Sequence, residues 1–195
     1  MIDSHTKASC FTPGATAGRL LTMLLAVTLF ALLTALGAHV AVPLGITPVP
    51  MTLQTLFVLL AGALLGPVAG ATSQLLYLGL GVAGVPVFAM GAAGLPWIFG
   101  PTGGYLMAFP LAAALVGWIS GSDGRALRTA IALVVGSSVI FVMGAGWLAV
   151  VTDLGPGALF AVGVQPFLVG AVVKAAVCFA ATRRIVAKGR RQGVG

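Results

Sequence analysis

The chain has 195 residues, of which 59% are hydrophobic and 7% are charged, and its mean hydropathy is +1.14. This composition is typical of an integral membrane protein embedded in a lipid bilayer and excludes an ordinary soluble domain. The net charge of +7 does not indicate nucleic-acid binding, because six of the ten basic residues lie near the chain ends and no aromatic patch is interleaved with them.

The N-terminal part of the chain predicts a mobile tail over residues 1–18 and then a transmembrane helix over residues 19–42. The apolar run is too long for the core of a signal peptide, so we expect the helix to be retained. It contains two pairs of small residues one turn apart, which allow another helix to approach closely. That helix could belong to this chain or to a partner subunit. The pairs are Ala31 with Ala35 and Thr34 with Ala38.

The next part of the chain begins with a proline-rich connection, which is expected to be stiff and extended. Two short helices are then expected over residues 52–65 and 68–81, on either side of Pro67. Glycine recurs every fourth residue through this junction, at Gly62, Gly66 and Gly70. The spacing predicts a tight helical hairpin.

Residues 82–102 are apolar but are interrupted by glycine or proline every few positions. Such a backbone cannot face lipid, where its N–H and C=O groups would lack partners. We therefore expect a re-entrant, lid-like outer loop that folds over a pocket. Its aromatic residues Phe88, Trp97 and Phe99 are candidates for the apolar wall of that pocket.

Three further helices are expected over residues 104–119, 129–151 and 166–182, with Pro166 as the first residue of the last one. The predicted fold is all-α: an integral membrane bundle of six transmembrane helices.

The six predicted helices form one membrane domain over residues 19–186, followed by a basic tail over residues 187–195. An even number of helices puts both termini on one side, together with the basic turn at residues 120–128. By the positive-inside rule that side is the cytoplasm, so we expect a multi-pass protein of the plasma (inner) membrane with cytoplasmic termini.

Lys174 lies in the middle of the last apolar segment, whereas residues 20–122 contain no charged side chain at all. A lone ammonium group is costly in lipid, so it must face the protein interior or a wet cavity. No carboxylate lies near it in the sequence, and we expect the missing anion to arrive with a ligand. Gly170 and Ala171 share its helix face and leave room above it, and Phe167 can cover it. The alternative is a lysine that reaches the membrane surface or bonds backbone carbonyls.

Three glutamines and a tyrosine are further candidates for the pocket. Gln54, Gln74 and Gln165 could each hydrogen-bond an amide-like or urea-like ligand, or could instead tie two helices together. Tyr105 could line the pocket or lie at the membrane interface.

Catalytic and cofactor motifs are weak in this sequence. Gly79–Gly84 matches a dinucleotide fingerprint, but it lies at the end of a membrane helix and no acidic residue follows until Asp123. The phosphate-binding loop of ATPases is absent from the sequence. His39 is the only histidine outside the N-terminal tail, and no pair of carboxylates could perform acid–base chemistry or bind a metal. We therefore expect no enzymatic activity, no metal and no cofactor.

Several blocks of the sequence resemble the BioY family, the biotin-capturing S components of energy-coupling-factor (ECF) vitamin transporters. The resemblance covers roughly residues 20–182. It implies that six helices hold biotin near the outer face under a loop and deliver it to the cytoplasm. It also implies docking to a transmembrane coupling subunit with two cytoplasmic ATPases, which some family members are proposed to do without. The blocks are Val49–Pro67, Leu76–Leu78, Gly84–Ala89, Gly100–Leu106 and Pro166–Lys174.

With biotin as the expected ligand, the candidate residues can be given roles. Lys174 would pair with the carboxylate of biotin, one of the glutamines would serve the ureido ring, and the aromatic residues would hold the apolar stem. The family pattern Gly-Asp-x-x-Lys has an aspartate at the position of Ala171, so this chain keeps the lysine and lacks the acid. The alternatives are an S component for another vitamin, a membrane enzyme that uses His39 or a serine, and a channel.

Overall fold

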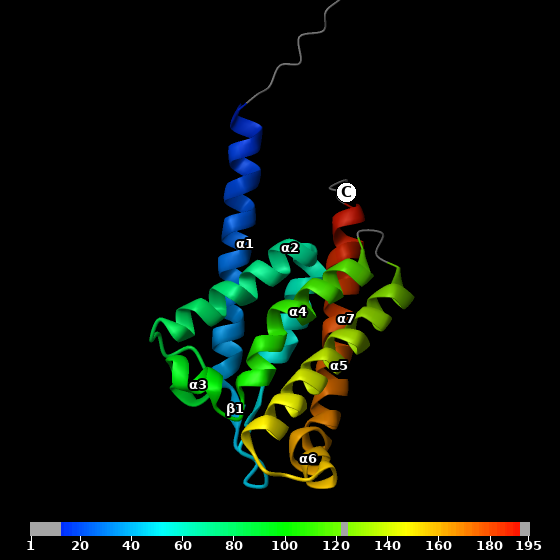
Figure 1. Ribbon diagram of the computed structural model, residues 1–195. Coiled ribbons are helices and arrows are strands. Elements are labelled where there is room, and N and C mark those ends of the chain that lie inside the picture. The colour runs from blue at the N-terminus through cyan, green and yellow to red at the C-terminus, as the bar shows by residue number, and fades with distance from the viewer. Residues whose placement is uncertain (1–12, 122–124, 192–195) are drawn as a thin grey trace, which may run out of the picture.

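The computed structural model describes residues 13–121 and 125–191, which form a bundle of long helices (Figure 1). Five stretches are long and apolar enough to cross a membrane, and the second of them is broken in the middle, which gives six apolar helical segments. The predicted helical membrane bundle is thus confirmed. The elements in chain order are α1 (Pro13–His39), β1 (Ala41–Val42), β2 (Met51–Thr52), α2 (Gln54–Val82), η1 (Ala89–Gly91), α3 (Leu95–Phe99), α4 (Gly103–Ser120), α5 (Ala126–Val151), α6 (Pro156–Gly163), η2 (Gln165–Phe167) and α7 (Leu168–Arg191).

The break in α2 lies at Gly66, whose φ of 81° and ψ of −177° are not helical. A side chain would be strained at this φ, and the following Pro67 has no N–H to continue the helix. Beyond the break, the Gly70 backbone lies against that of Gly62, so the two halves of α2 pack closely at the turn. Figure 1 shows the second half running off at a steep angle to the first. The junction predicted at Pro67 is confirmed.

Glycine lets α2, α4 and α5 approach closely in the centre of the bundle. A Cβ atom on Gly117 of α4 would lie 2.4 Å from the backbone of Gly66 and Pro67. A Cβ atom on Gly136 of α5 would lie 2.4 Å from the Val116 side chain. At Gly117 two backbones touch, and at Gly136 a side chain of the neighbouring helix packs directly on the backbone, as small residues allow in membrane proteins.

The small residues of the first helix are used inside the chain. Ala31, Thr34, Ala35 and Ala38 are all buried, and α1 packs on α2. Of the two readings that the sequence left open, the structure therefore supports packing within the chain rather than an exposed docking face.

The short elements gather at one end of the bundle, which we call the hairpin end. It carries the antiparallel β1–β2 hairpin, α3 and α6 (Figure 1). The described ends of α1 and α7, the last turn of α4 and the first turn of α5 lie at the opposite end, which we call the termini end. The prediction that both termini share one side with the 120–128 turn agrees with this arrangement for the described residues.

The segment between α2 and α4 folds back on the bundle at the hairpin end. Its Phe88 ring lies against Gly81, and the N–H of Gly94 donates a hydrogen bond of 2.7 Å to the carbonyl of Gly81. The Trp147 Nε1–H of α5 donates to the carbonyl of Gly100 at 3.0 Å. These hydrogen bonds give partners to backbone groups of a segment that forms no long helix. The sequence predicted that such a segment would be covered by protein rather than by lipid.

The element bounds differ from the prediction at three places. The last helix begins at Leu168, because Gln165–Phe167 form a 3-10 turn that places Pro166 before the helix. Helix α6 occupies Pro156–Gly163, where the sequence analysis expected a short turn. Helix α1 begins before the expected domain limit of residue 19, and α7 ends after the expected limit of residue 186. The rest of the two expected tails lies outside the described residues.

Candidate functional site

A cavity lies between α2, α4, α5 and α7 and is closed partly by the hairpin. It contains about 750 Å³ of atom-free space, including the part that opens to the outside. Most of its wall is apolar or aromatic, and a few polar groups interrupt it, as in ligand pockets generally. The aromatic residues are Trp97, Tyr105, Phe109, Phe141 and Phe167, and the residues with polar side chains are Thr52, Gln54, Thr55, Thr102, Ser137 and Lys174.

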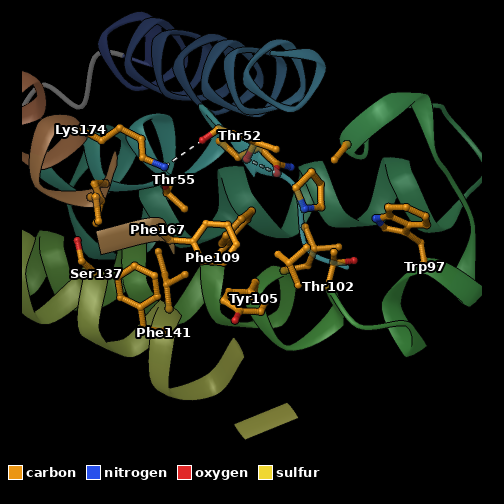
Figure 2. Close-up of a pocket in the computed structure, with 18 residues that line it drawn as sticks. Thr52, Thr55, Trp97, Thr102, Tyr105, Phe109, Ser137, Phe141, Phe167 and Lys174 are labelled. Carbon is orange, nitrogen blue, oxygen red and sulfur yellow. Dashed lines mark hydrogen bonds between the residues drawn. The ribbon is translucent and has the colours of Figure 1, made fainter. Parts of the chain in front are cut away.

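Lys174 projects from α7 into the wall of this cavity (Figure 2). Its Nζ donates a hydrogen bond of 3.0 Å to the backbone carbonyl of Thr52 in β2. Asp153, the one acidic residue in the described ranges, is exposed in the connection between α5 and α6. No ion pair to Lys174 occurs within residues 13–121 and 125–191. The ammonium is therefore held by a carbonyl dipole and carries an uncompensated positive charge.

Gln54 begins α2 and is fixed at the cavity wall by two neighbours. Its Oε1 accepts a hydrogen bond of 2.9 Å from the Thr52 hydroxyl, and its Nε2 donates to the Tyr77 hydroxyl. Tyr77 is fully buried and meets the Phe88 ring edge-on, with 5.7 Å between the ring centroids. One N–H of the Gln54 amide and one lone pair of its oxygen stay available.

Six of the residues predicted from the sequence line the cavity together. The Tyr105 ring forms part of the wall while its hydroxyl points elsewhere, donating to the Gly163 carbonyl at 2.5 Å. The six are Gln54, Trp97, Tyr105, Phe167, Ala171 and Lys174.

Two of the predicted glutamines lie away from the cavity. Gln74 is fully buried between helices, where its Oε1 accepts a hydrogen bond of 3.3 Å from the Thr34 hydroxyl. Its Nε2 donates to the Ser73 hydroxyl at 3.0 Å, so the amide ties α2 to α1. Gln165 is exposed in η2.

Three further predicted residues are also outside the cavity wall. Phe88 is fully buried in the core behind Tyr77, and Phe99 is 64% exposed on α3. Gly170 lies against Met51 of the hairpin, where an added Cβ would be 3.2 Å from the sulfur. Its small size lets the hairpin approach α7 rather than leaving space for a ligand.

Several wall residues were not predicted from the sequence, and one signal could have found three of them, Phe109, Ser137 and Phe141. Tyr105 and Phe109 on α4, and Ser137 and Phe141 on α5, are pairs four positions apart, so each pair lies on one helix face. Thr52, Thr55 and Thr102 had no such signal, because they lie where loops join helices.

Residues considered for catalysis do not assemble into a catalytic site. The His39 ring nitrogen Nδ1 bonds the Ala35 carbonyl at 2.8 Å, at the end of α1. Within the described ranges no three His, Cys, Asp or Glu side chains come close enough to hold a metal ion.

Comparison with known proteins gives consistent matches. The sequence matches the model of the BioY family over residues 7–191. A probable biotin transporter BioY of Pyrococcus horikoshii is 43% identical over 159 residues, which cover 82% of this chain and 93% of the relative. Biotin transporter BioY2 of Lactococcus lactis is 36% identical over 158 residues, which cover 79% of this chain and 86% of the relative. The crystal structure of the S-component for biotin from an ECF-type ABC transporter is similar, with a TM-score of 0.80 and 25% identity. That match covers 86% of this chain and 92% of the solved one.

Proposed function

The chain belongs to the BioY family, and on that premise we propose that it is the biotin-binding S component of an ECF-type transporter. It is a multi-pass membrane protein that captures biotin at the outer face and delivers it to the cytoplasm without altering it chemically. The observation that carries the proposal is the Lys174 ammonium, which lies at the wall of a largely apolar cavity with a backbone carbonyl as its partner.

Biotin has the chemistry that this cavity complements. Its carboxylate would pair with Lys174, whose ammonium has three N–H donors and uses one of them for the Thr52 carbonyl. Figure 2 shows Lys174 and Trp97 at opposite ends, with the rings of Phe109 and Phe167 between them. These rings would pack on the apolar stem of the ligand.

The ureido ring of biotin both donates and accepts hydrogen bonds. Of the three glutamines considered from the sequence, Gln54 lines the cavity, and its amide keeps one donor and one acceptor position. We assign Gln54 to the ureido ring and exclude Gln74 and Gln165, because the first is bonded between helices and the second is exposed.

The charge distribution supports an orientation with cytoplasmic termini. Six basic residues of the described ranges lie at the termini end of α1, α5 and α7, and the acidic Asp153 lies at the hairpin end. We therefore propose that the hairpin end faces the outside of the cell and that biotin enters the cavity from that end. The basic residues are Arg19, Arg125, Arg128, Arg183, Arg184 and Lys188.

Inward delivery needs a source of energy, and the chain has no phosphate-binding loop of its own. We propose that a transmembrane coupling subunit and two cytoplasmic ATPases supply it, as the S-component fold implies.

Thermal unfolding of the detergent-purified chain tests the proposed ligand. Biotin at 100 times its dissociation constant should stabilise the folded protein by about 2.7 kcal/mol, and so raise its Tm, because it binds the folded state alone. Thiamine and riboflavin at equal concentration should leave the Tm unchanged. A shift with either of these vitamins and none with biotin would contradict the proposal.

A further inference from the structure

Three polar side chains from three different helices line one end of the cavity. Lys174 comes from α7, Thr55 from the first turn of α2, and Ser137 from the middle of α5. In Figure 2 the hydroxyl-bearing side chains of Thr55 and Ser137 lie at the Lys174 end, away from Trp97. This end of the cavity is thus lined by one cation and two hydroxyl groups.

The two hydroxyl groups lack a bond to their own helix that five other hydroxyls on the described helices make. A hydroxyl in a membrane helix can donate to a carbonyl three or four residues earlier. That bond is present at Thr22, Thr34, Thr72, Ser73 and Thr129. The hydroxyls of Thr55 and Ser137 have no hydrogen-bond partner within residues 13–121 and 125–191. Ser120 and Thr182 lack a partner there as well, but they do not line the cavity. Thr55 and Ser137 line it and are therefore available for a ligand.

We propose that Thr55 and Ser137 are specificity-determining residues that donate hydrogen bonds to the ligand carboxylate beside Lys174. The inference rests on the proposed function and extends it, since nothing above assigns either hydroxyl a role. A carboxylate has two oxygens and about four acceptor positions, which one ammonium cannot fill. Two hydroxyl donors from α2 and α5 complete that set.

The neighbourhood of this subsite favours an anion over a neutral group. Ala171, one turn before Lys174, presents a methyl group to the cavity and no charge. Among the described residues no acidic side chain lines the cavity. A monocarboxylate can therefore bind without displacing a competing anion of the protein, whereas a neutral end group would leave the ammonium uncompensated.

Two isosteric or nearly isosteric substitutions test the inference, Thr55→Val and Ser137→Ala, in the full-length detergent-purified chain. Affinity is measured for biotin and for biotinol, the alcohol that lacks the carboxylate. Each substitution should weaken biotin binding about tenfold, since a hydrogen bond to a charged group contributes about 1.5 kcal/mol or more and each 1.4 kcal/mol is tenfold. Biotinol affinity should change less than about twofold, because hydrogen bonds to its neutral hydroxyl are weaker than those to a carboxylate and their loss costs less.

Ser138→Ala is the matched control, because Ser138 is the next residue on α5 and is exposed. It should leave the affinity for both ligands unchanged. Biotinol binding also reports that each variant is folded.

The inference is overturned if both variants bind biotin as tightly as the parent chain, or if they lose biotin and biotinol affinity equally. In either case biotin binding by the parent chain still supports the proposed function. Absence of biotin binding by the parent chain itself would overturn the proposed function as well.

Discussion

At the scale of single residues, the cavity depends on how buried polar groups find partners. The sequence offered two readings of Lys174, a ligand-binding cation and a lysine bonded to backbone carbonyls. The structure combines them, since the ammonium bonds the Thr52 carbonyl and still lines the cavity. The neutral carbonyl occupies one N–H donor of the ammonium and does not balance its charge. The two remaining N–H donors and the positive charge therefore determine what the site can bind.

Lys174 could be predicted as a site residue from the sequence, whereas Thr55 and Ser137 could not. A single charge in a long apolar segment is conspicuous because its burial is costly, and so Lys174 could be singled out. Thr55 and Ser137 could not, because a hydroxyl in an apolar helix can bond its own backbone and so gives no sign in the sequence of where it points. Only the tertiary packing shows which hydroxyls face the cavity.

The Gln54–Tyr77 contact gives a prediction at this scale. Tyr77→Phe should lower the free energy of unfolding by about 1–3 kcal/mol, because the buried Gln54 Nε2 loses its acceptor and stays unsatisfied. Thermal unfolding of the two proteins measures the difference. In a Gln54→Ala background the same tyrosine substitution should cost much less, as a double-mutant cycle requires for a coupled pair. Equal losses in the two backgrounds would show that the contact does not stabilise the protein.

At the scale of elements, the long helices could be predicted and the short connecting elements could not. Apolar runs of span length determine the helices, and Gly66 with Pro67 marks the break in α2. Helix α6 and the η2 turn have the same apolar composition as the helices around them, so composition gave no sign of their bounds. Their positions follow instead from contacts with α5 and with each other.

Packing between α4 and α5 supports the cavity and gives a second prediction. A Cβ atom on Gly144 would lie 2.2 Å from the ring of Tyr105, which lines the cavity. Gly144→Ala should therefore displace that ring, destabilise the fold by about 1–3 kcal/mol and weaken biotin binding. Thermal unfolding and biotin titration measure the two effects.

Gly146 on the same helix is the matched control. It is exposed, and a Cβ atom there would meet nothing within 4 Å. Gly146→Ala should leave binding unchanged and keep or slightly raise the Tm, because alanine favours the helix. If the two alanine variants behaved alike, close packing at Gly144 would not support the cavity wall.

At the scale of the whole molecule, the two ends of the bundle differ in structure and in charge. The hairpin end carries the short elements, several of which line the cavity, and the termini end carries basic residues. The sequence predicted that both termini share one side because an even number of apolar helices requires it. It could not give the cavity, because the wall combines residues from α2, α4, α5 and α7 that are far apart in the chain.

Cysteine labelling in intact cells checks the proposed orientation. In a chain with Cys10 and Cys178 replaced, Gly155→Cys lies in the exposed connection before α6 and Lys188→Cys near the end of α7. A membrane-impermeant maleimide should label position 155 in intact cells and position 188 only after permeabilisation. The reverse pattern would place the hairpin end in the cytoplasm and contradict the proposed direction of transport.

The central claim is that one uncompensated ammonium group selects a carboxylated ligand, and titration with biotin and biotin methyl ester tests it most directly. The parent chain should bind the acid at least about 30-fold more tightly than the ester, the equivalent of about 2 kcal/mol for a desolvated charge pair. Lys174→Met, which keeps the length of the side chain and removes its charge, should bind acid and ester equally weakly. Equal affinity of the parent chain for the two ligands, or undiminished acid binding by the Lys174→Met variant, would contradict the account.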